Sequence, residues 1–178
     1  MKKLLAICTS LLLLTACNKK VTELPPATQT GANTFGAKVN GELWVPKGFA
    51  GIPANDALQV RFLANMNMYI NAMDFSKSPT EKEFEIFIQN VTGPGTYQLN
   101  TNVTYPTTNA SYAYYVKRTL TPQEEWITSS IYTGSVTITK LDIPNKIVSG
   151  TFQFNLVNIY NAAQTLSVTE GRFDIKIP

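Results

Sequence analysis

Apolar residues recur at every second position over most of this chain, and that alternation constrains the fold more than any other feature. Phe84, Ile86 and Ile88 share one parity, whereas Glu83 and Glu85 share the other. Successive side chains of a β-strand point to opposite faces of a sheet. The pattern therefore predicts strands with one buried face and one solvated face.

Three short segments between the alternating runs carry residues typical of turns and bulges. Asn40-Gly41 supplies the positive φ angles of a two-residue hairpin turn. Pro144-Asn145 suits the two central positions of a β-turn. In the last run the apolar parity slips near Glu170-Gly171, which predicts a β-bulge there.

About nine or ten short strands at near-regular spacing predict an all-β domain, most simply an antiparallel two-sheet β-sandwich. A closed lipocalin-like β-barrel is the alternative. The one helix signal is Thr121-Pro122-Gln123-Glu124, with a capping Thr and a Pro at the first helical position. We therefore expect a single short helical turn near residues 121–126, within one β domain that spans residues 35–178.

The first 17 residues have the order of a bacterial export signal. Lys2 and Lys3 precede an apolar stretch of thirteen residues, Leu4 to Ala16, which is shorter than the roughly 20 that a membrane-spanning helix needs. The stretch ends in Leu14-Thr15-Ala16-Cys17, which resembles the lipobox of bacterial lipoproteins. This resemblance implies that residues 1–16 are removed and that Cys17 becomes an N-acyl diacylglycerylcysteine.

Residues 17–34 are expected to form the lipid anchor and a flexible tether. Asn18 to Asn33 is rich in Pro, Thr, Asn and small residues and shows no apolar period. Pro25-Pro26 stiffens this segment locally towards polyproline II. Sixteen extended residues reach at most about 50 Å, enough to lift a domain clear of lipid headgroups.

The charge of the processed chain gives no reason to expect nucleic acid as a partner. Two of the 15 Lys and Arg residues leave with the signal, which lowers the formal net charge from +3 to +1. The remaining basic residues are not clustered, unlike those of nucleic-acid-binding surfaces. The expected partners are the membrane, through the Cys17 lipid, and a glycan or an envelope protein.

Two absences narrow the chemistry that this chain can perform. It contains no His, the commonest general base and a frequent metal ligand. Cys8 leaves with the signal and Cys17 is alkylated, so no thiol remains in the mature chain. We expect no metal site and no cofactor.

Carboxylate pairs keep one enzymatic alternative open, because glycosidases need only two acids at a defined separation. The candidates are Glu83, Glu85, Asp174 and Glu124-Glu125. A simpler interpretation places the first three on solvated strand faces and Glu124 at the cap of a turn. A carboxylate-only glycoside hydrolase is therefore the remote alternative to a non-enzymatic role.

Aromatic residues crowd into one Asn- and Thr-rich stretch of the chain. Aromatic rings and amide side chains together are typical of sugar-binding and protein-binding surfaces. The simpler alternative is that alternate members, Tyr112 and Tyr114, fill the core. Candidate partner-binding residues are Tyr105, Tyr112, Tyr115, Trp126 and Tyr132.

The chain as a whole resembles a family of uncharacterised lipoproteins from Bacteroidota. The resemblance rests on the lipobox, the Pro-containing tether and the segments FGAKVNGELW at 35–44, SGTFQF at 149–154 and EGRFD at 170–174. It implies no activity and no catalytic residues. Surface-exported lipoproteins of that phylum commonly carry acidic residues after the Cys, and Asn18-Lys19-Lys20 differs from this. We therefore expect an outer-membrane location on the periplasmic face, with the cell surface as the alternative.

These observations favour a lipid-anchored cell-envelope binding module for a glycan or an envelope protein, and not an enzyme. A structural or assembly lipoprotein of the envelope, without a small ligand, is the alternative. Exposure of the candidate aromatic residues on one surface would favour binding, and their burial would favour the structural role.

Overall fold

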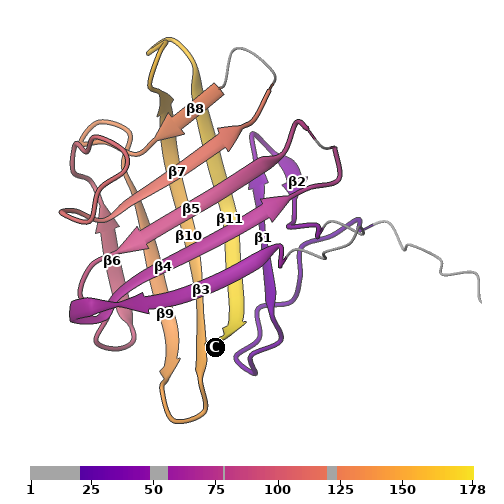
Figure 1. Ribbon diagram of the computed structural model, residues 1–178, viewed down its shortest axis with the longest axis vertical. Helices are drawn as coiled ribbons and strands as arrows, with labels where there is room; N and C mark the ends of the chain where they lie inside the picture. The colour runs from indigo at the N-terminus through magenta and orange to yellow at the C-terminus, as the bar shows by residue number, and fades with distance from the viewer. Residues whose placement is uncertain (1–20, 49–55, 78, 120–123) are drawn as a thin grey trace, which may run out of the picture.

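The computed structural model describes residues 21–48, 56–77, 79–119 and 124–178 (Figure 1). A 3-10 turn, η1 (Ala64–Met66), joins the third and fourth strands. No helix in these ranges is long and apolar enough to cross a membrane. The strands are β1 (Thr34–Val39), β2 (Glu42–Trp44), β3 (Leu58–Leu63), β4 (Asn67–Asp74), β5 (Lys82–Ile88), β6 (Gly95–Leu99), β7 (Tyr112–Lys117), β8 (Glu124–Ile127), β9 (Gly134–Asp142), β10 (Ile147–Asn158) and β11 (Thr165–Lys176).

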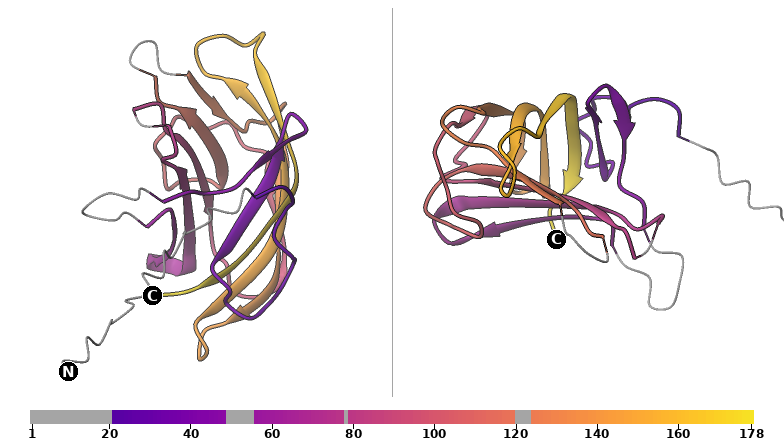
Figure 2. Two further views of the ribbon diagram at one scale, coloured as in Figure 1. Left: turned by 90° about the vertical axis from the view of Figure 1, so that its right-hand side faces the viewer. Right: turned by 90° about the horizontal axis from the view of Figure 1, so that it is seen from above.

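One continuous antiparallel sheet contains all 11 of these strands. Its main path runs β2-β1-β11-β10-β8-β7-β5-β4-β3, while β9 also pairs with β10 and β6 pairs with β9. The long strand β10 carries two partners on one edge, since its first part pairs with β9 and Val157 and Asn158 pair with β8. The sheet divides at this point and folds over, so that the layer from β8 to β3 faces the layer that contains β1, β11 and β10 (Figure 2).

The prediction of an antiparallel all-β domain is confirmed, with 11 strands in the described residues rather than nine or ten. The two layers belong to a single sheet curled into an open half-barrel, which lies between the predicted sandwich and the barrel alternative. The prediction of a helical turn near 121–126 is wrong for residues 124–126. These residues belong to β8 (Glu124–Ile127), which pairs with β7 and β10. Residues 120–123 lie outside the described part of the chain.

The three predicted turn and bulge segments are confirmed. Asn40 and Gly41 have φ angles of 49° and 83° and connect β1 to β2. The N–H of Lys146 donates to the carbonyl of Ile143 at 3.1 Å, which places Pro144-Asn145 at the centre of the turn between β9 and β10. The registers of β1 and β10 on β11 both shift beside Glu170, whose φ of 53° bends the strand as a bulge requires.

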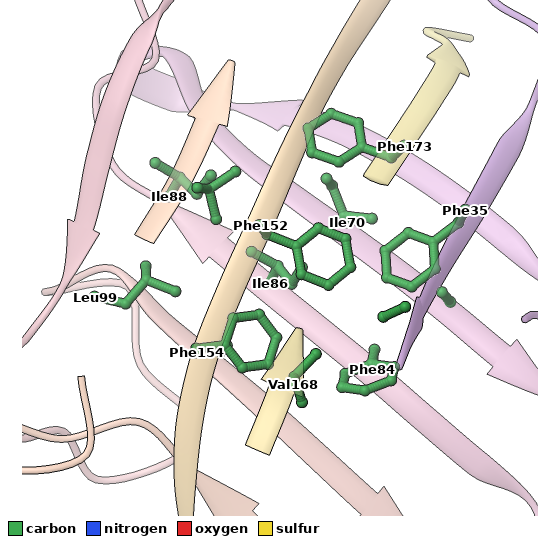
Figure 3. Packing of buried hydrophobic residues seen from close by; sticks show 14 of the residues in the cluster. Phe35, Ile70, Phe84, Ile86, Ile88, Leu99, Phe152, Phe154, Val168 and Phe173 are labelled. Carbon is green, nitrogen blue, oxygen red and sulfur yellow. The ribbon is translucent and has the colours of Figure 1, made fainter. Parts of the chain in front are cut away.

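A core of aromatic and aliphatic side chains fills the space between the two layers (Figure 3). The ring of Phe35 on β1 lies 5.0 Å from that of Phe152 on β10 and 6.0 Å from that of Phe84 on β5. Phe35 therefore packs against both layers. Rings at these separations add about 0.5–1.5 kcal/mol per pair beyond the area that they bury. This core holds the inner faces together and leaves the outer faces free for other contacts.

Candidate functional site

The outer face of the β4–β5–β7–β8 layer carries a second, smaller apolar cluster. The segment between β6 and β7 covers it, because Val103 and Tyr105 pack against this cluster. The ring of Tyr105 stacks on that of Tyr114 with centroids 3.8 Å apart and planes 2° from parallel. The buried members of the cluster are Phe87, Tyr112, Tyr114, Val116 and Ile127.

Glu85 lies beside this cluster, on the outward face of β5. Phe84 and Ile86 point into the main core, so the alternation of the strand directs Glu85 outward. Across the sheet it is paired with Asn71 on β4 and with Tyr114 on β7. Only 5% of Glu85 is exposed, so its outward direction does not place it in solvent.

Three tyrosine hydroxyl groups donate hydrogen bonds to the Glu85 carboxylate. The hydroxyl of Tyr69 lies 2.8 Å and that of Tyr105 3.0 Å from Oε2, while Tyr112 donates to Oε1. Burying a carboxylate is costly unless its oxygens are hydrogen-bonded, and bonds to an ionised acceptor are the strong ones. The three hydroxyl groups therefore make a buried negative charge tolerable at this position.

The same contacts change the ionisation of the tyrosines. Burial is the largest of the causes that raise the pKa values of Tyr69, Tyr105 and Tyr112 well above the ordinary value of about 10. The negative charge of Glu85 and the hydrogen bond to it raise these pKa values further. All three hydroxyl groups therefore stay protonated at neutral pH and act as donors to Glu85.

A pocket of about 650 Å³ opens over Glu85, and we call it the tyrosine pocket. The guanidinium of Arg61 lies at its edge, 4.9 Å above the centre of the Tyr69 ring. Binding sites for small molecules are concave, in part aromatic, and carry a few placed polar groups. The tyrosine pocket is lined by Arg61, Leu63, Tyr69, Glu85, Phe87, Tyr105, Pro106, Thr107, Thr108, Asn109 and Tyr112.

Glu85 is the single carboxylate in the lining of the tyrosine pocket. Glu83 shares its face of β5, but the oxygens of Glu83 accept hydrogen bonds from Asn71 and, at 2.7 Å, from Arg118. A glycosidase needs two acids flanking one bond. The lining instead combines one carboxylate with hydroxyl, amide and guanidinium groups, which suits the binding of a hydroxylated ligand.

The described residues contain no group of three or more His, Cys, Asp or Glu side chains that could hold a metal ion.

The structure separates the aromatic residues that the sequence grouped. Tyr105 and Tyr112 line the tyrosine pocket, although only 2% of Tyr112 is exposed. Tyr115 and Trp126 are only 1% and 3% exposed and belong to the main core, so the expectation of a surface role for them is corrected. The cause is strand parity, because Tyr115 points to the opposite face of β7 from Tyr112.

Tyr132 lies away from the pocket, half-buried in the turn before β9, where its N–H donates to the hydroxyl of Ser129 at 3.0 Å. Cys17 lies outside the described residues.

Sequence reasoning missed Tyr69 and Arg61, and it misjudged the exposure of Glu85. A weak signal was present, since Tyr69 alternates with the apolar residues Met68 and Ile70 in β4. An aromatic residue on the expected polar face of a strand indicates that something covers that face. The covering segment itself has no regular pattern that would identify its position.

A second buried carboxylate, Asp174 on β11, holds the N-terminal segment instead of lining a pocket. It accepts hydrogen bonds from the Thr28 hydroxyl at 2.6 Å, the Ser149 hydroxyl at 2.7 Å and the Gly31 N–H at 2.8 Å. The backbone N–H groups of Thr30 and Ala32 also donate to it. Asp174 was expected to face solvent, and that expectation is wrong because only 1% of it is exposed.

These contacts also correct the expected flexibility of the tether. Burial would raise the pKa of Asp174, but the hydrogen bonds from Thr28, Ser149, Thr30 and Gly31 outweigh burial and hold the pKa well below its usual range. The ionised carboxylate fixes residues 28–32 to the domain. Less of the segment is therefore free to act as a spacer.

Comparison with known proteins gives a family but no activity. A family model described as a domain of unknown function (DUF6252) matches residues 32–178. The matched segment contains all 11 strands, the tyrosine pocket and Asp174. No curated protein and no solved structure matches the chain.

Proposed function

The chain belongs to the DUF6252 family, a domain of unknown function, and from its geometry we propose that it is a lipid-anchored glycan-binding module of the cell envelope. One observation carries this proposal. Three tyrosine hydroxyl groups converge on one buried carboxylate in an open pocket of about 650 Å³. The role proposed for this pocket is binding without catalysis.

The composition of the tyrosine pocket favours a sugar among the candidate ligands. Sugar rings present C–H faces that pack on aromatic rings and hydroxyl groups that need paired donors and acceptors. An ionised carboxylate has about four lone-pair sites, of which three tyrosines occupy three in Glu85. The remaining site, the guanidinium of Arg61 and the side chain of Asn109 would serve sugar hydroxyl groups. The Thr107 hydroxyl accepts from the Asn109 N–H at 3.1 Å and can still donate to a ligand.

The size of the pocket favours a glycan over an envelope protein. A volume of about 650 Å³ lies within the usual range for small ligands. A stable protein–protein interface instead buries roughly 800 Å² on each partner, a surface much wider than the mouth of one such pocket. If no glycan binds, the alternatives are a protein partner or a purely structural role.

The proposed location rests on the sequence of the N-terminal region. The lipobox and the resemblance to Bacteroidota lipoproteins support acylation of Cys17, and Asn18-Lys19-Lys20 supports the periplasmic face of the outer membrane. We expect Cys17→Ser to leave an unprocessed precursor that takes up no labelled palmitate. Normal labelling of that variant would contradict the anchor.

The decisive experiment for the pocket is a glycan array probed with the full mature chain, followed by calorimetry on the glycans that bind. Tyr105→Ala removes one aromatic wall and should weaken binding about tenfold, as truncation of a central tyrosine commonly does. Tyr160→Ala is the matched control, because Tyr160 is 71% exposed and lies outside the pocket. Equal affinity of the two variants, or no bound glycan at all, would refute the proposal.

A further inference from the structure

The described residues before β1, 21–33, run against the domain (Figure 1). Leu24 and Pro25 pack on β1 so closely that a Cβ at Gly36 would lie 2.7 Å from Cδ of Pro25. Further along, Asp174 holds residues 28–32. The described part of the expected tether is thus bound to the surface of the domain.

Val21 is the described residue nearest to the expected lipid anchor. Three residues lie between it and Cys17, so even a fully extended chain places the two at most about 14 Å apart. Any surface beside Val21 must therefore lie close to the lipid headgroups, provided that Cys17 is acylated as proposed above.

Val21 lies in a basic cleft of about 210 Å³ at one end of β4 and β5, which we call the lysine cleft. Three lysines line it, Lys47, Lys77 and Lys82, against one acidic residue, Asp74. Among the described residues, the salt bridges involve other cations than these three. The hydroxyl-bearing residues Ser76 and Thr80 complete the polar lining, and Leu43, Trp44 and Val45 contribute the rest.

We propose that the lysine cleft binds anionic lipid headgroups of the membrane that holds Cys17. The attraction between a basic surface and anionic headgroups falls off within about 8 Å at physiological ionic strength. A free tether of up to about 50 Å would let the cleft move far beyond that range, whereas the bound segment leaves at most about 14 Å of chain between Val21 in the cleft and the anchor. The domain then lies on the membrane in one orientation, with the end of β4 and β5 towards the lipid.

Lysine labelling of the lipid-anchored full chain tests this proposal, which rests on the anchor of the proposed function. The protein is reconstituted in vesicles of phosphatidylcholine alone, or with phosphatidylglycerol added, and treated with a membrane-impermeant amine reagent. We expect labelling of Lys47, Lys77 and Lys82 to fall about fivefold in the anionic vesicles, equivalent to about 1 kcal/mol for each charge. Lys146, which is exposed at the turn between β9 and β10, is the internal control and should not change.

A pair of charge-matched variants separates the cleft from net charge. Lys47 and Lys77 are both exposed, so Lys47→Gln/Lys77→Gln should fold normally and abolish the protection of Lys82 in anionic vesicles. Lys146→Gln/Lys176→Gln removes the same charge elsewhere and should leave Lys82 protected. Loss of protection in both variants would overturn the proposal.

The remaining outcomes also distinguish this inference from the proposed function. Equal labelling of Lys47 and Lys77 in both kinds of vesicle, with the acyl mass present on Cys17, overturns the headgroup site and leaves the anchor standing. Equal protection in both kinds of vesicle also overturns it, because neutral lipid cannot supply the anionic partner. An unmodified Cys17 in the same digests overturns both.

Discussion

The carboxylates of Glu85 and Asp174 lie on outward faces of the same curled sheet, the first on β5 and the second on β11. Both are buried, and both are covered by chain that has no regular secondary structure. Backbone N–H groups of residues 30–32 donate to Asp174. Glu85 is instead satisfied by hydroxyl groups on tyrosine rings.

This difference separates a carboxylate that fixes the chain from one that shapes a pocket. Backbone donors belong to the segment that they hold, so the segment closes over Asp174 and leaves no room for a ligand. Tyrosine hydroxyls stand at the ends of long rings, so they can surround Glu85 while the space above it stays open. Removing each carboxylate should therefore change different properties of the molecule.

The largest effect is expected from Asp174→Asn. The amide oxygen can still accept, but the new NH₂ group faces donors, so several buried N–H and O–H groups lose their partner. We expect the free energy of unfolding in urea to fall by about 3 kcal/mol. Asp142→Asn, at the last residue of β9, is the control and should cost less than about 1 kcal/mol.

The pH dependence of stability sharpens this prediction. Because the folded-state pKa of Asp174 is lowered, the unfolded chain binds more protons below its ordinary pKa of about 3.9. The contribution of Asp174 is complete above that pH and is lost as the pH falls towards the folded-state value. The difference in the free energy of unfolding between the wild type and Asp174→Asn should shrink below about pH 4. A difference that stays constant with pH would show that the carboxylate charge does not cause the loss of stability.

A smaller loss of stability is expected from Glu85→Gln, which keeps the shape of the side chain but removes its charge. Three tyrosine hydroxyls then share one amide oxygen, so the free energy of unfolding should fall by about 1–2 kcal/mol. Glu170→Gln, which loses only the exposed salt bridge to Lys38, should stay within about 1 kcal/mol of the wild type.

Glycan binding distinguishes the two acids more sharply than stability does. The Glu85→Gln variant should lose glycan binding, whereas the Asp174→Asn variant should retain glycan binding at temperatures where the domain is folded. The reverse result would assign the ligand to the N-terminal segment and not to the tyrosine pocket.

The smallest effect is expected in the ionisation of the pocket tyrosines. Burial and Glu85 raise the pKa values of Tyr69 and Tyr112, so ultraviolet titration should find both protonated at pH 11. Because the folded state keeps protons that the unfolded state releases, stability should decline as the pH rises above about 10. In Glu85→Gln these pKa values should fall towards 10, and an unchanged titration would show that burial alone controls them.

The faces and turns of the sheet could be predicted from the sequence because they depend on local rules. Period-two alternation correctly placed Glu85 and Asp174 opposite the apolar residues of their strands. Asn40-Gly41 and the parity slip at Glu170-Gly171 were sufficient to predict a hairpin turn and a bulge. Each of these features is determined by residues adjacent in the chain.

The site could not be predicted in the same way, because it depends on contacts between distant segments. Alternation assigns a residue to a face of a sheet and contains no information about what covers that face. Tyr105 reaches Glu85 from a segment 20 positions away in the chain, and Thr28 reaches Asp174 from 146 positions away. Tyr115 and Trp126 were misplaced because the aromatic cluster in the sequence divides between the two faces once the strands form.

The half-barrel leaves strands with unpaired backbone groups at its margins, and such strands can pair with a second copy of the molecule. Confinement to a bilayer would raise the frequency with which copies collide. In the described part of the chain these marginal strands are β2, β3 and β6. β2 has only three residues, β3 carries the charged Arg61, and Pro94 immediately precedes β6. Short length, charge and proline each oppose the addition of a further strand, so the architecture resists polymerisation on a crowded surface.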